Sequence, residues 1–340
     1  MGRKNKAYVK TLHQQAYDRL MQMMHTGESK KAAMAEGTMD DKIFSYNTYK
    51  TYWQHIKDFL TFVKKNHPEC TTLRAAKKHV REWLQSREDE NLSAWTVQVD
   101  AKAVNKLYGI KPGDKEYFDP PKRNRGDIKR SRGECVRDQH FSVTNNDELI
   151  RFCRGSGLRR SELENLRGED LMTRGQIEAE ISRIEALPKA ERTPRDEADL
   201  KMLLDTRMFK GEYFIRVRNG KGGRKRVSPI IGKDIQRIVE RMENTPPKDK
   251  VWQYVNSNAD IHAYRADYAT AIYKAYARPI EDIPYDKVNK GTGRKYQSEV
   301  YSCRKDEAGK KLDKAAMLIC SKALGHNRIS VVADYYIRGL

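Results

Sequence analysis

The sequence feature that most limits the possible folds is a stretch rich in proline, glycine and basic residues one third of the way along the chain. Residues 111–138 combine several helix-breaking sites with a dense run of Lys and Arg. Such a segment does not continue a helix and lacks the alternation of a strand. With about 150 residues as an ordinary domain size, the 340-residue chain predicts two domains, 1–110 and 139–340, joined by a basic interdomain linker.

Residues 1–110 show the spacing of amphipathic helices. Apolar and aromatic side chains recur at helical intervals after residue 45, and two later segments, beginning near residues 73 and 92, repeat the pattern. Ser45 or Asn47 is a candidate N-cap of the first of these, Ser93 is a candidate N-cap of the last, and Gly109 is a candidate stop. An earlier helix is expected over 10–24. The pattern predicts a small all-helical bundle.

Residues 139–340 mix helical segments with one predicted β-hairpin. The segment EYFIRVRNGKGGRKRVSPI alternates, turns at its glycines and carries a basic tip. Two stretches, near 172–206 and 279–312, are expected to be insertions; the first reads as a helical hairpin and the second as an irregular basic segment with a short strand at EVYSCR. The fold class predicted for the whole chain is mainly α with a small β-hairpin or sheet.

The charge of the chain favours a polyanionic partner. Lys and Arg total 67 against 47 Asp and Glu, a formal net charge of +20, and neutralising phosphates with such cations releases condensed counterions. No apolar run approaches the ~20 residues that span a bilayer, and the N-terminus lacks a secretory signal. The five cysteines form no CxxC pair, so neither a disulfide framework nor a zinc ribbon is indicated. We therefore expect a cytoplasmic protein without a membrane partner.

The second domain contains the side chains that break a phosphodiester without metal or cofactor. Forked guanidinium groups meet the growing charge on the non-bridging oxygens, a hydroxyl attacks phosphorus, and a general acid protonates the leaving oxygen. Candidates occur in order along the chain. They are Arg159 in SGLRRSEL, Lys221 in NGKGGRKR, His262 and Arg265 at i and i+3 of one helix, His326 in ALGH and Tyr336 in ADYYIRGL.

This series of motifs resembles the tyrosine recombinase, or phage integrase, family. The strongest pieces are GLRRSEL at 157–163, IHAYRADYAT at 261–270 and ALGHNRIS at 323–330. The resemblance covers residues ~139–340, and the helical residues 1–110 resemble the family's SAM-like core-binding domain. It implies an all-helical DNA-binding domain followed by a mixed α+β catalytic domain.

The resemblance also implies a role for each matching residue. Arg159 and Arg265 would clamp the scissile phosphate, and His326 would hydrogen-bond a non-bridging oxygen. Lys221 would protonate the leaving 5′-oxygen, and His262 would assist proton transfer at the nucleophile. Tyr336 would attack and form a 3′-phosphotyrosine, and Glu162 would orient Arg159. No metal, cofactor or ATP is implied.

Several positions have competitors. Tyr335 is the alternative nucleophile, because adjacent residues of a helix point ~100° apart and only one of the two can face the phosphate. Lys225 competes with Lys221, Arg160 with Arg159, and YSCR mimics the His-x-x-Arg box with Tyr301 and Arg304. The histidines outside the motifs show no metal-ligand spacing. Expected contacts to the DNA backbone are Lys122, Arg123, Arg125, Lys129, Arg130, Arg224, Lys225 and Arg226.

The function implied is a site-specific recombinase or integrase of a mobile element, acting on double-stranded DNA as a homo-tetramer on two sites. A type IB topoisomerase or a telomere-resolving strand transferase shares the chemistry, and relaxation of any supercoiled plasmid would distinguish the topoisomerase. A catalytically idle DNA-binding relative is the alternative of another class. It would bind DNA but form no covalent adduct.

Overall fold

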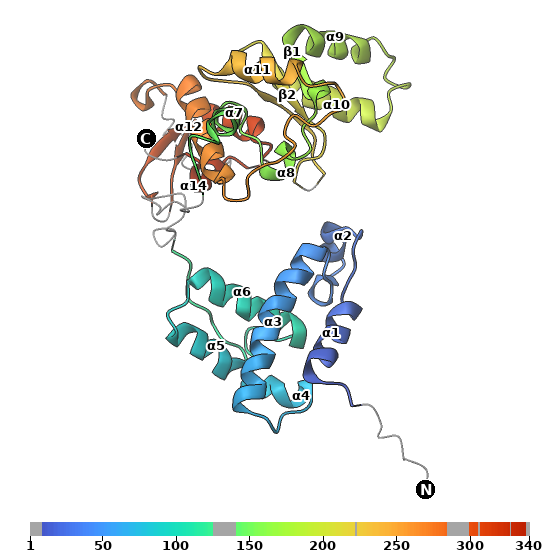
Figure 1. The fold of residues 1–340 in the computed structure, drawn as a ribbon, viewed down its shortest axis with the longest axis vertical. Coiled ribbons are helices and arrows are strands. Elements are labelled where there is room, and N and C mark those ends of the chain that lie inside the picture. The colour runs from blue at the N-terminus through green and yellow to red at the C-terminus, as the bar shows by residue number, and fades with distance from the viewer. Residues whose placement is uncertain are drawn as a thin grey trace, which may run out of the picture. The chain divides into compact units, whose positions relative to one another are not determined.

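The computed structural model describes residues 9–124, 141–221, 223–283, 299–304, 307–326 and 328–337. The chain folds into two compact units, Met1–Asp127 and Ile128–Leu340. Figure 1 traces both. The predicted linker, 111–138, is described as far as residue 124, and its remainder lies outside the described residues.

The N-terminal unit is built from helices in its described part. They are α1 (Leu12–Gln22), α2 (Lys30–Ala35), α3 (Tyr46–Asn66), α4 (Leu73–Ala76), α5 (Val80–Asp89) and α6 (Ala94–Tyr108). Ser45 accepts the Thr48 N–H at the start of α3, and Ser93 caps α6 in the same way. Gly109 ends α6 in the left-handed region at φ 65°. These observations confirm both predicted caps, with Ser45 rather than Asn47, and the predicted stop.

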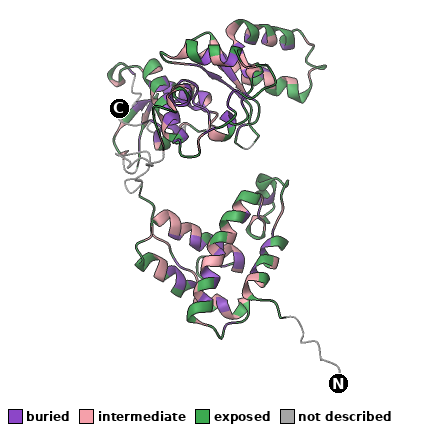
Figure 2. Cartoon of the chain, viewed as in Figure 1, coloured by how far each residue is buried: buried purple, intermediate pink, exposed green. Residues whose placement is uncertain are grey.

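The core of the N-terminal unit lies between α3, α5 and α6. Ile56, Phe59 and Leu60 of α3 are fully buried and share a cluster with Trp83 of α5 and Val104 of α6. Figure 2 shows buried residues on the inward faces of these helices and exposed residues on their outer faces. Burying each large apolar side chain stabilises the unit by about 1.5–3 kcal/mol before entropy is counted, which makes packing the main reason that the bundle holds.

The C-terminal unit combines helices with two small antiparallel sheets. Its helices are α7 (Asp147–Ser156), α8 (Arg160–Leu163), α9 (Arg174–Glu185), α10 (Pro194–Leu204), α11 (Ile235–Glu243), α12 (Ile261–Tyr276), α13 (Lys314–Ala323) and α14 (Ser330–Tyr335). Strands β1 (Leu171–Thr173), β2 (Tyr213–Val217) and β3 (Arg226–Pro229) form one sheet in that order, and β4 (Val300–Ser302) pairs with β5 (Lys311–Asp313). The fold class is mainly α with small sheets, as predicted.

Two segments expected to be insertions have regular structure. Residues 172–206 contain β1 and then the helical hairpin α9–α10, whose Ile177, Ile181 and Leu203 are fully buried in the core. Within 279–312, β4 covers the predicted short strand, while residues 284–298 lie outside the described part. Strand β1 was not predicted, because three residues are too short for an alternating pattern. Its pairing extends the predicted β2–β3 hairpin to three strands.

The C-terminal core brings distant motifs to one place. Helix α12 packs against α7 and α13, and α13 also packs against β3. The predicted motif residues therefore come from the turn before α8, the β2–β3 hairpin, the first turns of α12, the turn after α13 and the end of α14. Among the described residues, none of the helices has the length and apolar character required to traverse a lipid bilayer.

Candidate active site

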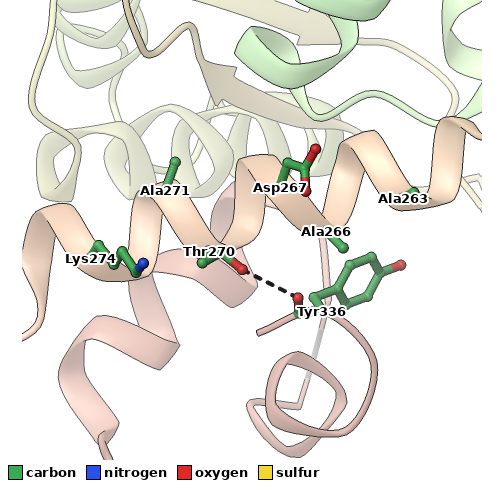
Figure 3. Close-up of a pocket in the computed structure, with 7 residues that line it drawn as sticks. All are labelled: Ala263, Ala266, Asp267, Thr270, Ala271, Lys274 and Tyr336. Carbon is green, nitrogen blue, oxygen red and sulfur yellow. Dashed lines mark hydrogen bonds between the residues drawn. The ribbon is translucent and has the colours of Figure 1, made fainter. Parts of the chain in front are cut away.

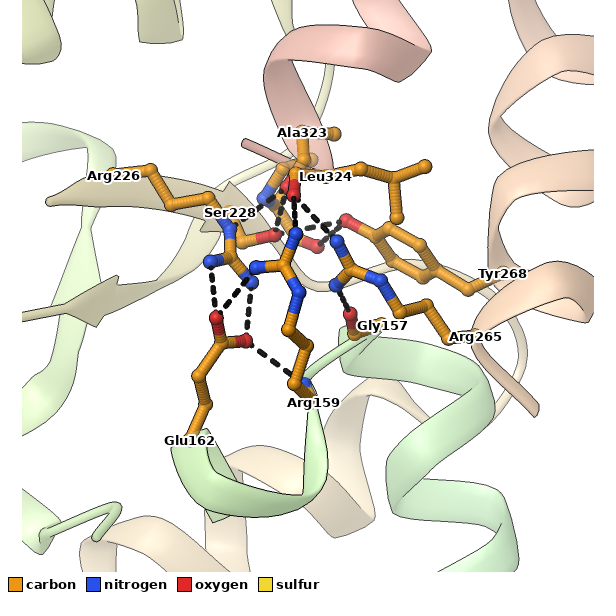
Figure 4. Close-up of polar contacts among 10 residues, drawn as sticks. Gly157, Arg159, Glu162, Arg226, Ser228, Arg265, Tyr268, Ala323 and Leu324 are labelled. Atoms are coloured by element: carbon orange, nitrogen blue, oxygen red, sulfur yellow. Dashed lines mark hydrogen bonds and ion pairs between the residues drawn. The ribbon is translucent and has the colours of Figure 1, made fainter. Parts of the chain in front are cut away.

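A buried carboxylate joins two arginines at the start of α8. Glu162 accepts the backbone N–H of Arg159 at 2.8 Å and one of its guanidinium nitrogens at 2.7 Å. Arg226, the first residue of β3, donates both terminal nitrogens to the two Glu162 oxygens, at 2.8 and 2.7 Å. Figure 4 shows Glu162 holding both guanidinium groups. The carboxylate thus orients Arg159, as the resemblance implied, and also holds Arg226.

Helix α12 adds a third guanidinium, that of Arg265, to the same cluster. Arg265 is 2 % exposed and donates to the carbonyls of Gly157 and Leu324. Gly157 has φ +61°, and a Cβ there would lie 2.2 Å from the ring of Tyr268. Only glycine therefore allows this turn to pass so close to α12, and the turn delivers both the carbonyl that Arg265 binds and the Arg159 that follows it.

The end of α13 closes the cluster. Arg226 donates its Nε to the Ala323 carbonyl at 3.1 Å, and Arg159 lies 3.4 Å from the Leu324 carbonyl. Figure 4 shows three guanidinium groups directed toward these two carbonyls. Because carbonyls at a helix C-terminus carry partial negative charge, they hold the cations in place without neutralising them.

The pKa values of the cluster reflect burial and crowding of like charges. Burial alone would raise the pKa of the Glu162 carboxyl, but the hydrogen bonds and charge of Arg226, with the charge of Arg265, hold it well below its usual range. Burial, Arg226 and Arg159 lower the pKa of Arg265 to about 10, so it stays charged at pH 7. Burial and the charges of Arg265 and Arg159 lower the pKa of His326 to about 3, which makes it neutral.

Tyr336 lies among the remaining motif residues. Its ring centroid is 5.2 Å from that of His262 and 5.2 Å from that of His326, and the Arg265 guanidinium carbon is 5.5 Å from it. Its backbone carbonyl accepts from Thr270 at 3.5 Å, and Figure 3 shows the ring beside α12. Tyr336 is 7 % exposed, whereas Tyr335 is 42 % exposed. Of the two candidate nucleophiles, Tyr336 is the buried one, and it contacts the cluster.

The hairpin between β2 and β3 places its basic residues in different environments. Lys221 is exposed at the tip and lines a depression of about 590 Å³ that Glu162 and Asn165 of the α8 region also line. Its charge also helps to lower the pKa of His326, after burial and the arginines. Arg224 is exposed, and Lys225 binds Asp199 of α10 at 2.9 Å. Lys221, and not its competitor Lys225, is therefore the lysine beside the arginine cluster.

One expected DNA contact requires correction. Arg226 is 6 % exposed, because it begins β3 with its side chain turned into the unit toward Glu162. Both terminal nitrogens are bound to that carboxylate, so it is not a surface contact to a DNA backbone. Of the others, Lys122 and Arg123 are exposed, and the Arg123 guanidinium stacks on Trp95. Arg125, Lys129 and Arg130 lie outside the described residues.

Two of the alternative residues for the other motif positions, Arg160 and Tyr301, have structural roles in the fold. The guanidinium of Arg160 donates to the carbonyls of Val255, Asn256, Ser257 and Ala259, which fixes the loop before α12. Tyr301 lies on β4 and packs against the hydrophobic core. Sequence reasoning missed the burial of Arg226 and the two carbonyls of α13. The role of these two carbonyls could not have been predicted from the sequence, because every residue carries a backbone carbonyl.

Comparison with known protein families finds a match for part of the N-terminal unit. Residues 36–112 match the sequence model of the phage integrase N-terminal SAM-like domain. Among solved structures, the chain is similar to the XerA recombinase, with 14 % identity, 95 % of this chain and 94 % of that chain covered, and a TM-score of 0.26. Among curated protein sequences there is no significant match.

Two features relate the chain to the phage integrases, the matched domain and the ordered motifs that follow it. A segment similar to the integrase SAM-like domain, residues 36–112, precedes a unit that brings Arg159, Arg265, His326 and Tyr336 together. Residues 36–112 are thus similar to the SAM-like domain of phage integrases, and the motifs that follow resemble those of the tyrosine recombinase, or phage integrase, family.

Proposed function

We propose that this protein is a site-specific DNA recombinase that cuts and rejoins strands through Tyr336. The observation that carries the proposal is the position of the Tyr336 ring, 5.2 Å from two histidine rings and 5.5 Å from a buried guanidinium. A phenol has an ordinary pKa of about 10 and needs neighbouring cations to act as a nucleophile at neutral pH. The arginine cluster supplies those cations.

The cluster has more positive than negative charge, which suits an anion. Three guanidiniums, Arg159, Arg226 and Arg265, surround one carboxylate, Glu162, and three minus one leaves two positive charges. Two buried nitrogens in the same place, Arg265 Nε and His326 Nε2, have no hydrogen-bond partner among the described residues. A scissile phosphate would balance the charge and accept from such donors.

The proposed reaction conserves the bond energy of the phosphodiester. The Tyr336 oxygen attacks phosphorus and forms a 3′-phosphotyrosine, and the 5′-oxygen leaves with a proton from Lys221. Arg159, Arg265 and His326 stabilise the charge on the non-bridging oxygens, and His262 takes the proton of the phenol. In the rejoining step, a 5′-hydroxyl from a second strand attacks the phosphotyrosine and releases the Tyr336 oxygen. Because the covalent bond retains the energy of the broken one, rejoining requires no ATP.

The remaining parts of the proposal follow from the family. The N-terminal unit would serve as the core-binding domain, with Lys122 and Arg123 on the DNA backbone, and Arg224 would add a phosphate contact at the hairpin. Four copies on two duplexes would exchange strands, as for an integrase of a mobile element. The net charge of +20 supports a double-stranded DNA partner through counterion release.

Trapping of the covalent intermediate tests this function. Duplexes bound by the protein are selected from a random library, and the selected site is nicked so that the cut strand diffuses away. We expect a protein–DNA adduct on denaturing gels, with DNA mapped to the Tyr336 peptide by mass spectrometry. Tyr336→Phe should abolish the adduct, and Tyr335→Phe is the matched control that retains it.

Three results would contradict or narrow the proposal. Absence of any adduct with the unaltered chain on the selected site would leave a DNA-binding protein without catalysis. An adduct that survives in Tyr336→Phe and maps to Tyr335 would move the nucleophile by one residue. Equal relaxation of plasmids with and without the site would indicate a topoisomerase instead.

A further inference from the structure

Two histidines and two glutamates meet in the N-terminal unit, far along the chain from the catalytic motifs. His67 and Glu69 follow the end of α3, His79 precedes α5 and Glu82 lies in its first turn. One ligand atom each from His67, Glu69 and His79 lies within 4.8 Å of the other two. The spacing of these residues along the chain does not indicate a site, because the two histidines belong to different elements.

Glu82 fixes the orientation of both imidazoles. Its Oε2 lies 2.9 Å from His67 Nε2 and 2.9 Å from His79 Nδ1. An ionised carboxylate only accepts hydrogen bonds, so these two nitrogens carry the hydrogens in neutral imidazoles. The other nitrogens, His67 Nδ1 and His79 Nε2, are then left with lone pairs. A carboxylate bound to the far nitrogen of a histidine is the arrangement that orients metal-binding imidazoles in proteins.

The fold brings ligand atoms of both histidines and of Glu69 within 4.8 Å of one another. The rings stack with centroids 3.4 Å apart and planes 18° apart, so one ring would turn on metal binding until the two nitrogens lie about 3.3 Å apart, as on a tetrahedral zinc ion with Zn–N bonds of about 2.0–2.1 Å. Glu69 Oε1 is 3.9 Å from His67 Nδ1. His79 Nε2 is buried and has no hydrogen-bond partner among the described residues, a costly state for an acceptor that nothing satisfies.

We propose that this group binds a divalent transition-metal ion, with zinc the best match to its donors. His67 Nδ1, His79 Nε2 and the Glu69 carboxylate would be the ligands, and water would take the fourth position. Glu82 would stay in the outer sphere and hold both rings. The ion would tie the loop after α3 to the start of α5 and so stabilise the N-terminal unit. This role is independent of strand cleavage, which takes place in the other unit.

Metal binding by the full-length chain tests the site. The purified protein is stripped with a chelator, dialysed against zinc, and its metal content is measured by mass spectrometry. Cobalt, bound in place of zinc, reports tetrahedral nitrogen and oxygen ligands by its visible absorption. We expect one equivalent of metal and a higher melting temperature with zinc than without it.

Three substitutions distinguish the proposed metal ligands from the outer-sphere carboxylate. Glu69→Gln should remove stoichiometric binding; its side chain is 65 % exposed, so the fold does not depend on it. His79→Ala should do the same. Glu82→Gln should weaken the affinity by about 10–100-fold without abolishing it, as loss of an outer-sphere carboxylate does.

The matched control is a histidine–carboxylate pair of the same unit that lacks a second histidine. His25 pairs with Glu28 at 2.7 Å, and His25→Ala should keep the full equivalent of metal and the zinc-dependent rise in melting temperature. Cys70→Ser should also keep both, because the Cys70 thiol is buried beside Glu69 but is not among the ligand atoms that converge. Less than one equivalent in the unaltered chain, or equal binding by Glu69→Gln and His25→Ala, would reveal adventitious metal only and overturn the proposal.

Discussion

Both units of the molecule contain a buried carboxylate among cations, and two of these carboxylates, Asp100 and Glu162, differ in their charge balance. In the N-terminal unit Asp100 is 0 % exposed and accepts from His55 at 2.5 Å and Arg87 at 3.2 Å. One negative charge thus meets one permanent positive charge. In the C-terminal unit Glu162 binds two guanidiniums directly, and a third, that of Arg265, lies close enough to depress its pKa.

The difference shows how a structural ion pair can be told from an anion site. A buried charge is tolerated when a partner neutralises it and hydrogen bonds satisfy its remaining atoms. Asp100 meets that condition with Arg87 and His55, so this buried pair requires no further charge. The C-terminal cluster keeps two positive charges in excess, held by the carbonyls of Ala323 and Leu324. Such an excess of positive charge favours the binding of an anion at this site.

The largest expected effect is on stability when Glu162 is neutralised. Glu162→Gln leaves Arg226 buried opposite like charges, and we expect the free energy of unfolding of the C-terminal unit to fall by about 3–5 kcal/mol. Asp100→Asn removes one charge from a balanced pair and should cost less, roughly 1.5–3 kcal/mol. Hydrogen exchange measured by mass spectrometry resolves the two units separately. A larger loss from Asp100→Asn would contradict the difference in charge balance between the two carboxylates.

Two single variants, each replacing one arginine in a different unit, should have a smaller effect, which is on the rate of strand cleavage. Arg159→Ala withdraws a donor from the proposed phosphate site, and the single-turnover rate on a nicked duplex should fall about 10²–10³-fold. Arg87→Ala breaks the pair with Asp100 in the other unit and should leave the rate at saturating protein unchanged. Equal losses in both variants would mean that the two arginines act through stability alone.

The sequence predicted the elements more completely than the environment of each side chain. Ser45, Ser93 and Gly109 were recognised as helix ends because capping depends on local residue type. The motif residues were recognised by their order along the chain. By contrast, Arg226 looked like one more basic residue of an exposed hairpin tip. Only the pairing of β3 with β2, and the packing of β3 on α13, direct it inward.

The metal-ligand group was missed for a related reason. Ligand motifs are recognised when the spacing of residues on one helix or hairpin brings them together. His67 and His79 lie on different elements, and the packing of α5 against α3 brings their rings into contact. Tertiary contacts of this kind leave no periodic trace in a single sequence. The site could be predicted only once the fold was known.

The smallest expected effect concerns the protonation of His326, and it tests the excess charge directly. Burial and the surrounding arginines lower its pKa to about 3, against an ordinary value of about 6.5 in the unfolded chain. Below pH 6.5 the unfolded chain therefore binds a proton that the folded protein does not, so His326 makes the fold less stable as the pH falls toward 3. His326→Gln should lose that part of the acid sensitivity. In NMR spectra of histidine-labelled protein, the signal missing from His326→Gln should not titrate between pH 5 and 8.

Adding the selected duplex should raise this pKa, because a phosphate anion offsets both the burial and the arginine charges that lower it. The direction of the shift shows whether a phosphate lies beside the ring. A bound duplex that placed no phosphate beside the ring would only exclude more water and would lower the pKa further. A rise on binding would require negative charge beside the ring, where the arginine cluster and Tyr336 meet. A His326 signal that titrates near 6.5 in the free protein would show instead that the excess charge does not reach this ring, and the contrast between Glu162 and Asp100 would lose its electrostatic basis.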